Sequence, residues 1–280
     1  MTWKRQAIAL LLQGAVLGCN PSSAVDGETE TDANATDTDP SDLPDPMCLP
    51  DWDVSSPSLR VRALMPSAPP PLALMGSGSQ TVIGDDEPTP LLTLSGQDGA
   101  THISGFFGTG IAADSEETYR FTEDPTPVSF VLDKNKLSSI EPFDFTLTAT
   151  LASGDVITVP LQEVSIQGIF TTEQRCSIGK EVPQDPFPVW HPGGSITGLL
   201  SVDDARSITV TYQTLTFSLC AYLAYGLTEG LHDDPYGEMD QSEWEYPPNA
   251  TLTSGELAWR TAAHIAATAI HLAGSVPSEH

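Results

Sequence analysis

The sequence predicts a mainly β protein: an antiparallel β-sandwich or barrel-like domain with one C-terminal α-helix packed on it. Two observations lead to this fold class. Apolar and polar residues alternate in many short segments, and a period of two is typical of a strand with one buried and one solvated face. Glycine, proline and aspartate separate these segments at short intervals, as turns do in all-β domains. We expect the β-rich domain over residues 54–225, a length that is ample for one core.

The first strand is expected at the start of this domain. Leu59, Val61 and Ala63 alternate there with Arg60 and Arg62, which predicts a sheet with one solvated face. Turn-forming residues separate the next strand candidates, which are Thr101–Ile111, Thr118–Phe121 and Val128–Leu132. The first of these contains a glycine-rich stretch, residues 105–110, that fits neither a dinucleotide fingerprint nor a phosphate-binding loop. We interpret these glycines as a bulged or tightly packed strand.

Two hairpins follow in the pattern. The clearer one runs from Phe143 to Leu161, with Ser153-Gly154 as its turn. The second joins residues 196–202 to residues 208–212 through a turn at Asp203–Arg206. The segment Leu215–Leu223 alternates as a strand does, although its end is also compatible with a helical turn.

One helix is expected near the C-terminus, within a segment, 253–280, that also contains a tail. Thr253 and Glu256 form the pattern of a capping box, alanine-rich sequence continues to Ala273, and Gly274 with Pro277 forms a stop signal. Five apolar residues at helical spacing mark the face that would pack on the sheet: Ala258, Ala262, Ile265, Ala269 and Leu272. His264 and His271, seven residues apart, are too far separated on such a helix to share one metal ion.

The charge of the chain restricts its partners. The sequence contains 38 acidic and 11 basic residues, a formal net charge of -27 at pH 7. A nucleic-acid-binding surface needs clustered Lys and Arg, so we expect no nucleic-acid partner. We interpret most of the carboxylates as a solvated surface that keeps the protein soluble.

The N-terminus has the sequence pattern of an export signal. A basic start at Lys4-Arg5, a short apolar run and the sequence Val16-Leu17-Gly18-Cys19 resemble the signal of bacterial lipoproteins. The resemblance covers only the first nineteen residues, and it implies cleavage before Cys19, acylation of that cysteine with chains such as palmitate, and an anchor in the membrane. In this family Asn20 implies the outer membrane over the inner one. Ordinary secretion after Ser22-Ser23-Ala24 is the open alternative.

The signal would span residues 1–18, and the next segment, 19–53, reads as a disordered tether. It contains ten acidic residues and no Lys or Arg. Its few large apolar side chains bury too little area to offset the cost of ordering the backbone, about 1–2 kcal/mol per residue. A lipid-anchored domain on an acidic tether is the organisation that these two segments predict.

If Cys19 carries lipid, three cysteines remain: Cys48, Cys176 and Cys220. Outside the cytoplasm one disulfide can form among them. The three pairings stay open, and we favour Cys176–Cys220 because both residues lie in the β region. The long spacings give no indication of a metal cluster.

The segment 226–252 is an acidic loop and the place where a binding site is expected first. It contains a dense group of carboxylates and one tryptophan: Asp233, Asp234, Glu238, Asp240, Glu243 and Trp244. Calcium takes six to eight oxygen ligands, and aromatic faces beside carboxylates suit sugar rings, so the loop is a candidate calcium or glycan site. The competing interpretation is a solvated loop. No other cofactor is expected.

No catalytic residue is assigned. Ser177 and Lys180 match S-x-x-K, but the serine follows Cys176 in a loop and lacks the companion signatures of that chemistry. We therefore expect a non-enzymatic cell-envelope lipoprotein whose β domain binds an envelope protein or a polysaccharide, or serves structurally. The competing hypothesis is an envelope hydrolase with a site assembled from distant residues: Asp203, Asp204, His191 and His232.

Overall fold

The computed structural model describes residues 48–49, 52, 54–75, 81–95, 101–113, 117–150, 156–182, 189–212, 215–226 and 228–273. The predicted signal peptide, Cys19 and most of the predicted tether lie outside these residues. Residues 44–280 form one compact unit, and all of the description below concerns that unit.

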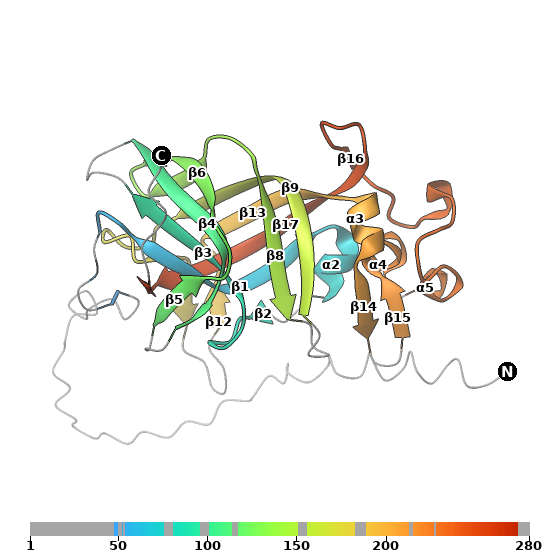
Figure 1. The fold of residues 1–280 in the computed structure, drawn as a ribbon, viewed down its shortest axis with the longest axis horizontal. Helices are drawn as coiled ribbons and strands as arrows, with labels where there is room; N and C mark the ends of the chain where they lie inside the picture. The colour runs from blue at the N-terminus through green and yellow to red at the C-terminus, as the bar shows by residue number, and fades with distance from the viewer. Residues whose placement is uncertain are drawn as a thin grey trace, which may run out of the picture. The chain divides into compact units, whose positions relative to one another are not determined.

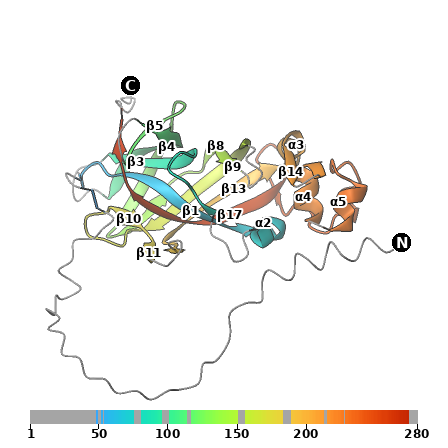
Figure 2. The ribbon, with the colours of Figure 1, turned by 90° about the horizontal axis from the view of Figure 1, so that it is seen from below.

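Eight strands pair antiparallel, each with two neighbours, and close on themselves as a ring (Figure 1). Their order around the ring is β1 (Ser58–Ala68), β3 (Thr89–Ser95), β4 (His102–Ala112), β6 (Thr126–Asp133), β7 (Lys136–Ser139), β9 (Val156–Ile169), β13 (Gly194–Ser201) and β17 (Leu257–Ala269). The ring closes because β17 pairs with β13 on one side and with β1 on the other. Figure 2 shows β1 and β17 side by side along the underside of the domain.

Shorter strands extend the edges of this ring. The strand β2 (Thr81–Val82) pairs with β1, and β8 (Phe143–Thr150) pairs with β9. The strands β10 (Ser177–Ile178) and β16 (Ala250–Thr251) pair with β17, and β5 (Thr118–Phe121) pairs with β4 and, in parallel, with β18 (His271–Leu272). Two separate ribbons are formed by β11 (Lys180–Val182) with β12 (Val189–His191) and by β14 (Thr209–Tyr212) with β15 (Leu215–Ser218).

The helices are short. They are α2 (Pro70–Met75), α3 (Val202–Ser207), α4 (Leu219–Tyr225), α5 (Glu229–Asp233) and the 3-10 turn η2 (Gln241–Glu243). The helices α3, α4 and α5 lie together at one end of the domain, beside the β14–β15 ribbon (Figures 1 and 2). Within the described part of the chain, no helix has the length and apolar character needed to cross a membrane.

Large apolar side chains fill the core, which extends from the ring into the helical end. Leu59, Phe130, Leu137 and Val164 are at most 1% exposed, and so is Trp259 of β17. Full burial of one such side chain contributes about 1.5–3 kcal/mol. The mainly β, barrel-like fold expected from the alternating pattern is therefore confirmed.

The strand predictions hold in most of the chain. The hairpin from Phe143 to Leu161 is formed by β8 and β9, although its predicted turn lies outside the described residues. The glycine-rich stretch forms part of β4, where a Cβ on Gly105 would lie 2.4 Å from the carbonyl oxygen of Thr93 and one on Gly110 2.2 Å from a methyl group of Leu91. Close packing of the strand against β3 therefore explains these two glycines.

The predicted C-terminal helix is wrong, because its residues form β17 and β18. Thr253 and Glu256 lie in the turn that joins β16 to β17, where the Leu252 amide donates to the Glu256 carbonyl and Gly255 has φ +90°. The helical preference of alanine is below about 1 kcal/mol per residue relative to other ordinary residues. Pairing with two neighbouring strands outweighs this preference, and the small alanines fit a strand that is buried from Ile265 to Ala269.

Two further predictions need correction. The strands predicted at residues 196–202 and 208–212 do not form a hairpin with each other, because β14 pairs with β15 and the segment between is α3. The predicted strand Leu215–Leu223 ends at Ser218, whose hydroxyl accepts a hydrogen bond from the Ala221 amide and caps α4. Ser and Asp at these positions favour helix starts, which the strand pattern concealed.

The disulfide joins Cys48 to Cys176, and Cys220 is a buried free thiol. The predicted pair Cys176–Cys220 is therefore wrong. Cys176 lies just before β10, whereas Cys220 lies in α4 at the helical end. The prediction assumed that both cysteines belong to one β region, whereas Cys220 lies in the helix α4, apart from Cys176. The bridge closes a loop of large sequence separation, 128 residues, between the N-terminal edge of the domain and its sheet.

Candidate functional site

A groove of about 410 Å³ lies beside β8, and it is bounded by β4, the segment before β6, β9 and α3. Its volume is in the range of small-ligand and side-chain pockets, about 300–1,000 Å³. The lining combines apolar, hydroxyl, amide and carboxylate side chains, and the residues that the argument below uses are Phe107, Phe145, Thr109, Thr126, Thr146, Gln162, Glu123, Asp124, Asp144 and Asp204.

Aromatic packing forms the base of the groove. Phe107 of β4 lies with its ring centroid 4.5 Å from that of Phe145 and 5.8 Å from that of Phe143, and both Phe107 and Phe145 are buried. Alternation along β8 directs Phe143 and Phe145 to this side, while Asp144 between them is exposed. The rings fix β8 against β4, so the polar atoms at the edge of β8 have a rigid support.

The outer edge of β8 presents backbone carbonyl groups to the groove. The Thr109 hydroxyl donates to the Thr146 carbonyl at 3.2 Å, and the Thr126 hydroxyl donates to the Asp144 carbonyl at 3.4 Å. Among the described residues β8 pairs with β9 alone, so no strand covers this edge. A carbonyl oxygen has two lone pairs, and each of these two can therefore accept a further hydrogen bond.

Asp204 lies at the α3 side of the groove. The Ser201 hydroxyl caps α3 by accepting from the Asp204 amide at 2.9 Å and donates to the Asp204 carboxylate at 2.8 Å. Gln162 of β9 donates to the same carboxylate oxygen at 3.4 Å. These contacts hold Asp204 in place and leave it half-buried.

Asp144 lies on β8 and accepts a hydrogen bond from the Glu163 amide at 3.3 Å. Glu163 has φ +51° and lies at an irregularity in the β8–β9 register, which turns its amide toward Asp144. Glu123 and Asp124, on the loop before β6, are exposed and have no hydrogen bond or ion pair to the described residues.

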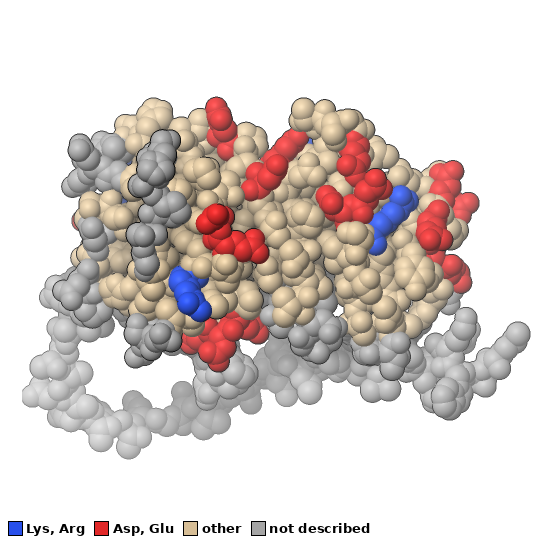
Figure 3. All heavy atoms as spheres, viewed as in Figure 1, with Lys and Arg blue, Asp and Glu red and all other residues tan. Residues whose placement is uncertain are grey.

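The groove is therefore acidic and rich in acceptors. Four carboxylates line it, no Lys or Arg does, and none of the four forms an ion pair among the described residues. Figure 3 shows the face that carries β4, β8 and β9, on which Asp and Glu far outnumber Lys and Arg. Carboxylates only accept hydrogen bonds, so the lining suits a ligand that carries N–H donors and positive charge.

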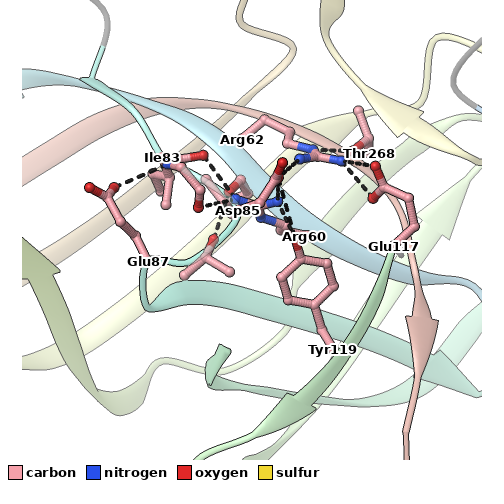
Figure 4. A network of polar contacts seen from close by, with 11 residues as sticks. Arg60, Arg62, Ile83, Asp85, Glu87, Glu117, Tyr119 and Thr268 are labelled. Carbon is pink, nitrogen blue, oxygen red and sulfur yellow. Dashed lines mark hydrogen bonds and ion pairs between the residues drawn. The ribbon is translucent and has the colours of Figure 1, made fainter. Parts of the chain in front are cut away.

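A second polar cluster surrounds Arg60 of β1 (Figure 4). The Arg60 side chain is fully buried and donates to the carbonyls of Ile83 and Gly84, the hydroxyl of Tyr119 and the carboxylate of Asp85. Its hydrogen bond to Asp85 is the main cause that holds the pKa of that carboxyl below its usual range. Burial raises the pKa of Tyr119.

Arg62 completes this cluster. It donates to Asp85 at 2.7 Å, to both carboxylate oxygens of Glu117 and to the hydroxyl of Thr268 (Figure 4). Two arginines thus face two carboxylates, and the charges balance. Because the cluster joins β1 to the loop after β2 and to the start of β5, we assign it a structural role. Arg60 and Arg62, which lie close together in the sequence at the start of the domain, therefore do not form a cationic surface.

The carboxylates of the predicted calcium or glycan site do not share one arrangement, because two of them bind separate partners within the loop. Asp234 is buried and its carboxylate accepts from the amides of Glu238 and Met239 and from the hydroxyl of Tyr225. Asp240 caps η2 through the Ser242 amide, and this bond holds the pKa of Asp240 below its usual range. The remaining three carboxylates are exposed: Asp233, Glu238 and Glu243. Across the described chain, no group of three or more His, Cys, Asp or Glu is placed to hold a metal ion.

Trp244, the aromatic residue of that prediction, is buried and stacks on Trp259 of β17 with centroids 5.6 Å apart. Its ring is part of the core and is not available to a sugar. The Asp234 carboxylate and the Trp244 indole thus both hold the acidic loop in place. Both groups stabilise the loop.

The residues of the hydrolase hypothesis do not come together. Asp203 and Asp204 lie on α3, His191 ends β12 and His232 lies on α5. Figure 1 places β12 and α5 toward opposite ends of the domain, and Figure 2 does the same for β11, the partner of β12. Of the four, only Asp204 lines the groove.

Sequence reasoning did not identify Glu123, Asp124, Asp144 or Gln162 as site residues. They come from three segments that only the fold brings together. The one local signal is Asp144, a charged residue between Phe143 and Phe145 of β8.

No protein-family model, curated protein or solved structure matches this chain.

Proposed function

We propose that this chain is a cell-envelope lipoprotein, anchored through Cys19, whose β domain binds a partner and does not catalyse a reaction. The observation that carries the proposal is the disulfide between Cys48 and Cys176. Such bridges persist in oxidising compartments and are rare in the cytosol. The bridge therefore supports export, which is what the N-terminal sequence predicts.

Binding is favoured over catalysis by the position of the polar groups. The groove lies on the surface of a ring whose interior is filled by side chains. Its lining supplies carboxylates, hydroxyls and one amide, whereas His191 and His232 lie on other elements. These groups can orient and hold a ligand, which is the task of a displayed binding domain.

The anchor is tested in a diderm bacterial host by fractionation and intact-mass measurement. We expect the wild-type protein to partition with membranes and to carry a mass increase of acyl chains on Cys19. Cys19→Ala is expected to release the protein or to leave the unprocessed form. A mature N-terminus at Val25 without added lipid would contradict the anchor.

The compartment is tested by thiol labelling of the same samples in denaturant without reductant. We expect Cys220 to be labelled and Cys48 and Cys176 to be protected until reductant is added. Labelling of all three without reductant would contradict export to an oxidising compartment.

A further inference from the structure

We propose that the groove beside β8 binds an extended, basic segment of a partner protein and places its Lys or Arg side chains among Glu123, Asp124, Asp144 and Asp204. This inference rests on the proposed binding function and names the chemistry of the partner. Three observations on the groove carry it.

The first observation is unbalanced charge. Asp85, Glu117 and Asp203, elsewhere in the domain, each have an arginine partner within 4 Å, but the four groove carboxylates have none among the described residues. Carboxylates close together repel one another, and a cleft concentrates their field. A cationic side chain placed between them relieves this repulsion, so the electrostatic complement of the groove is an ammonium or guanidinium group.

The second observation is the uncovered edge of β8. The carbonyls of Asp144 and Thr146 lie at the groove, where the described residues contact them through threonine hydroxyls. An extended peptide presents backbone N–H groups at the same spacing as a strand, so it can donate to such an edge while its alternate side chains reach pockets. A free polyamine has no such backbone. The edge therefore favours a peptide segment.

The third observation is rigidity. The Phe107, Phe143 and Phe145 rings fix β8 against β4, and Ser201 and Gln162 hold the Asp204 carboxylate. A site with fixed acceptors loses little conformational entropy when its ligand binds.

The test is calorimetric titration of the purified full chain with three probes at low and at physiological ionic strength. One probe is an extended peptide of alternating Lys and Ser, the second is the same peptide with Gln in place of each Lys, and the third is spermidine. We expect the Lys peptide to bind, with an affinity that falls as salt rises. The Gln peptide should not bind, and spermidine should bind at least about tenfold more weakly than the Lys peptide.

Two charge-matched variants locate the site. Asp124→Asn with Asp144→Asn removes two exposed carboxylates from the groove, and Asp86→Asn with Asp133→Asn removes two exposed carboxylates outside it. We expect the groove variant to lose about tenfold or more in affinity for the Lys peptide and the control variant to stay within about twofold. Thermal unfolding of both variants checks that each is folded.

Equal losses in the two variants would overturn the proposal, because the net charge alone would then attract the peptide. Spermidine binding as tightly as the Lys peptide would overturn the assignment to a peptide. The anchoring experiment is independent of both results: a membrane-bound protein that does not bind the peptide contradicts this inference alone, and a soluble protein that binds it contradicts the anchor alone.

Discussion

Trp244 stacks on Trp259 with ring centroids 5.6 Å apart and an angle of 13° between the ring planes. The contact joins the acidic loop to β17, the strand that closes the ring. The guanidinium of Arg206, a residue of α3, lies 6.0 Å from the Trp244 ring centroid. The Trp259 indole N–H donates to the Tyr246 carbonyl. This pair of rings therefore connects the acidic loop, β17 and α3.

Removing the Trp244 ring should destabilise the domain strongly. We expect Trp244→Ala to lower the free energy of unfolding by about 3–5 kcal/mol, as truncation of a large buried aromatic residue does. The measurement is urea unfolding followed by circular dichroism. Tyr236→Ala in the same loop is the control, because Tyr236 is 56% exposed and its removal should change stability by at most about 0.5 kcal/mol. Similar effects of the two substitutions would show that the loop does not pack as described.

Opening the disulfide should also lower stability. The bridge closes a sequence separation of 128 residues, for which the chain-entropy model gives up to about 5 kcal/mol. We expect Cys48→Ser to lower the melting temperature, and reductant to lower that of the wild type but not that of the variant. An effect of reductant on Cys48→Ser would point to a different pairing.

Burial raises the pKa of the Cys220 thiol to about 11, so Cys220 should resist alkylation until the protein is unfolded.

The Arg60 cluster predicts a specific acid sensitivity. Because the folded-state pKa of Asp85 lies below its usual range, the ionised carboxylate stabilises the fold above a pH of about 4, and this stabilisation is lost as the pH falls through the folded-state pKa. We expect Asp85→Asn to be less stable than the wild type at pH 6 and the difference to shrink toward pH 2.5. The measurement is urea unfolding at both pH values, with Asp86→Asn as the exposed neighbouring control. A difference that is independent of pH would contradict the role of the charge.

The close packing of β4 predicts intolerance of a side chain at Gly110. Its added Cβ would lie 2.2 Å from a Leu91 methyl group and 2.7 Å from the Arg120 carbonyl oxygen. We expect Gly110→Ala to cost about 1–3 kcal/mol, measured by thermal unfolding. Gly84→Ala is the matched control, since its Cβ would meet only ordinary contacts of 3.5 Å or more. If both variants melt together, β3 and β4 are less tightly packed than their geometry indicates.

The sequence predicts those parts of the fold that depend on local pattern. Alternation along residues 143–161 correctly predicts a hairpin, because each strand of the pair buries one face. The alanine-rich segment 257–269 fails because alanine fits a helix and a crowded strand alike, and the choice depends on the gap between β1 and β13. Local propensity contains no information about that gap.

The groove could not be predicted for a related reason. Glu123, Asp144 and Asp204 are separated along the chain by 21 and 60 residues, counted from their positions in the sequence. The three residues line one pocket because β8 packs against β4 and because the cap of α3 fixes the position of Asp204. The dense acidic loop was the stronger sequence signal, but two of its carboxylates, Asp234 and Asp240, accept hydrogen bonds from backbone amides within the loop.

The closure of the ring by β17 sets the order in which the domain can be completed. The strands β1 and β13 lack the neighbour that closes the ring until residues 257–269 are available, and those residues follow both strands in the sequence. A chain that is synthesised or translocated from its N-terminus therefore has two unpaired strand edges until residue 257 and its successors are available. The ring closes only when β17 is available, and a truncation before residue 257 would leave both edges free to join another chain.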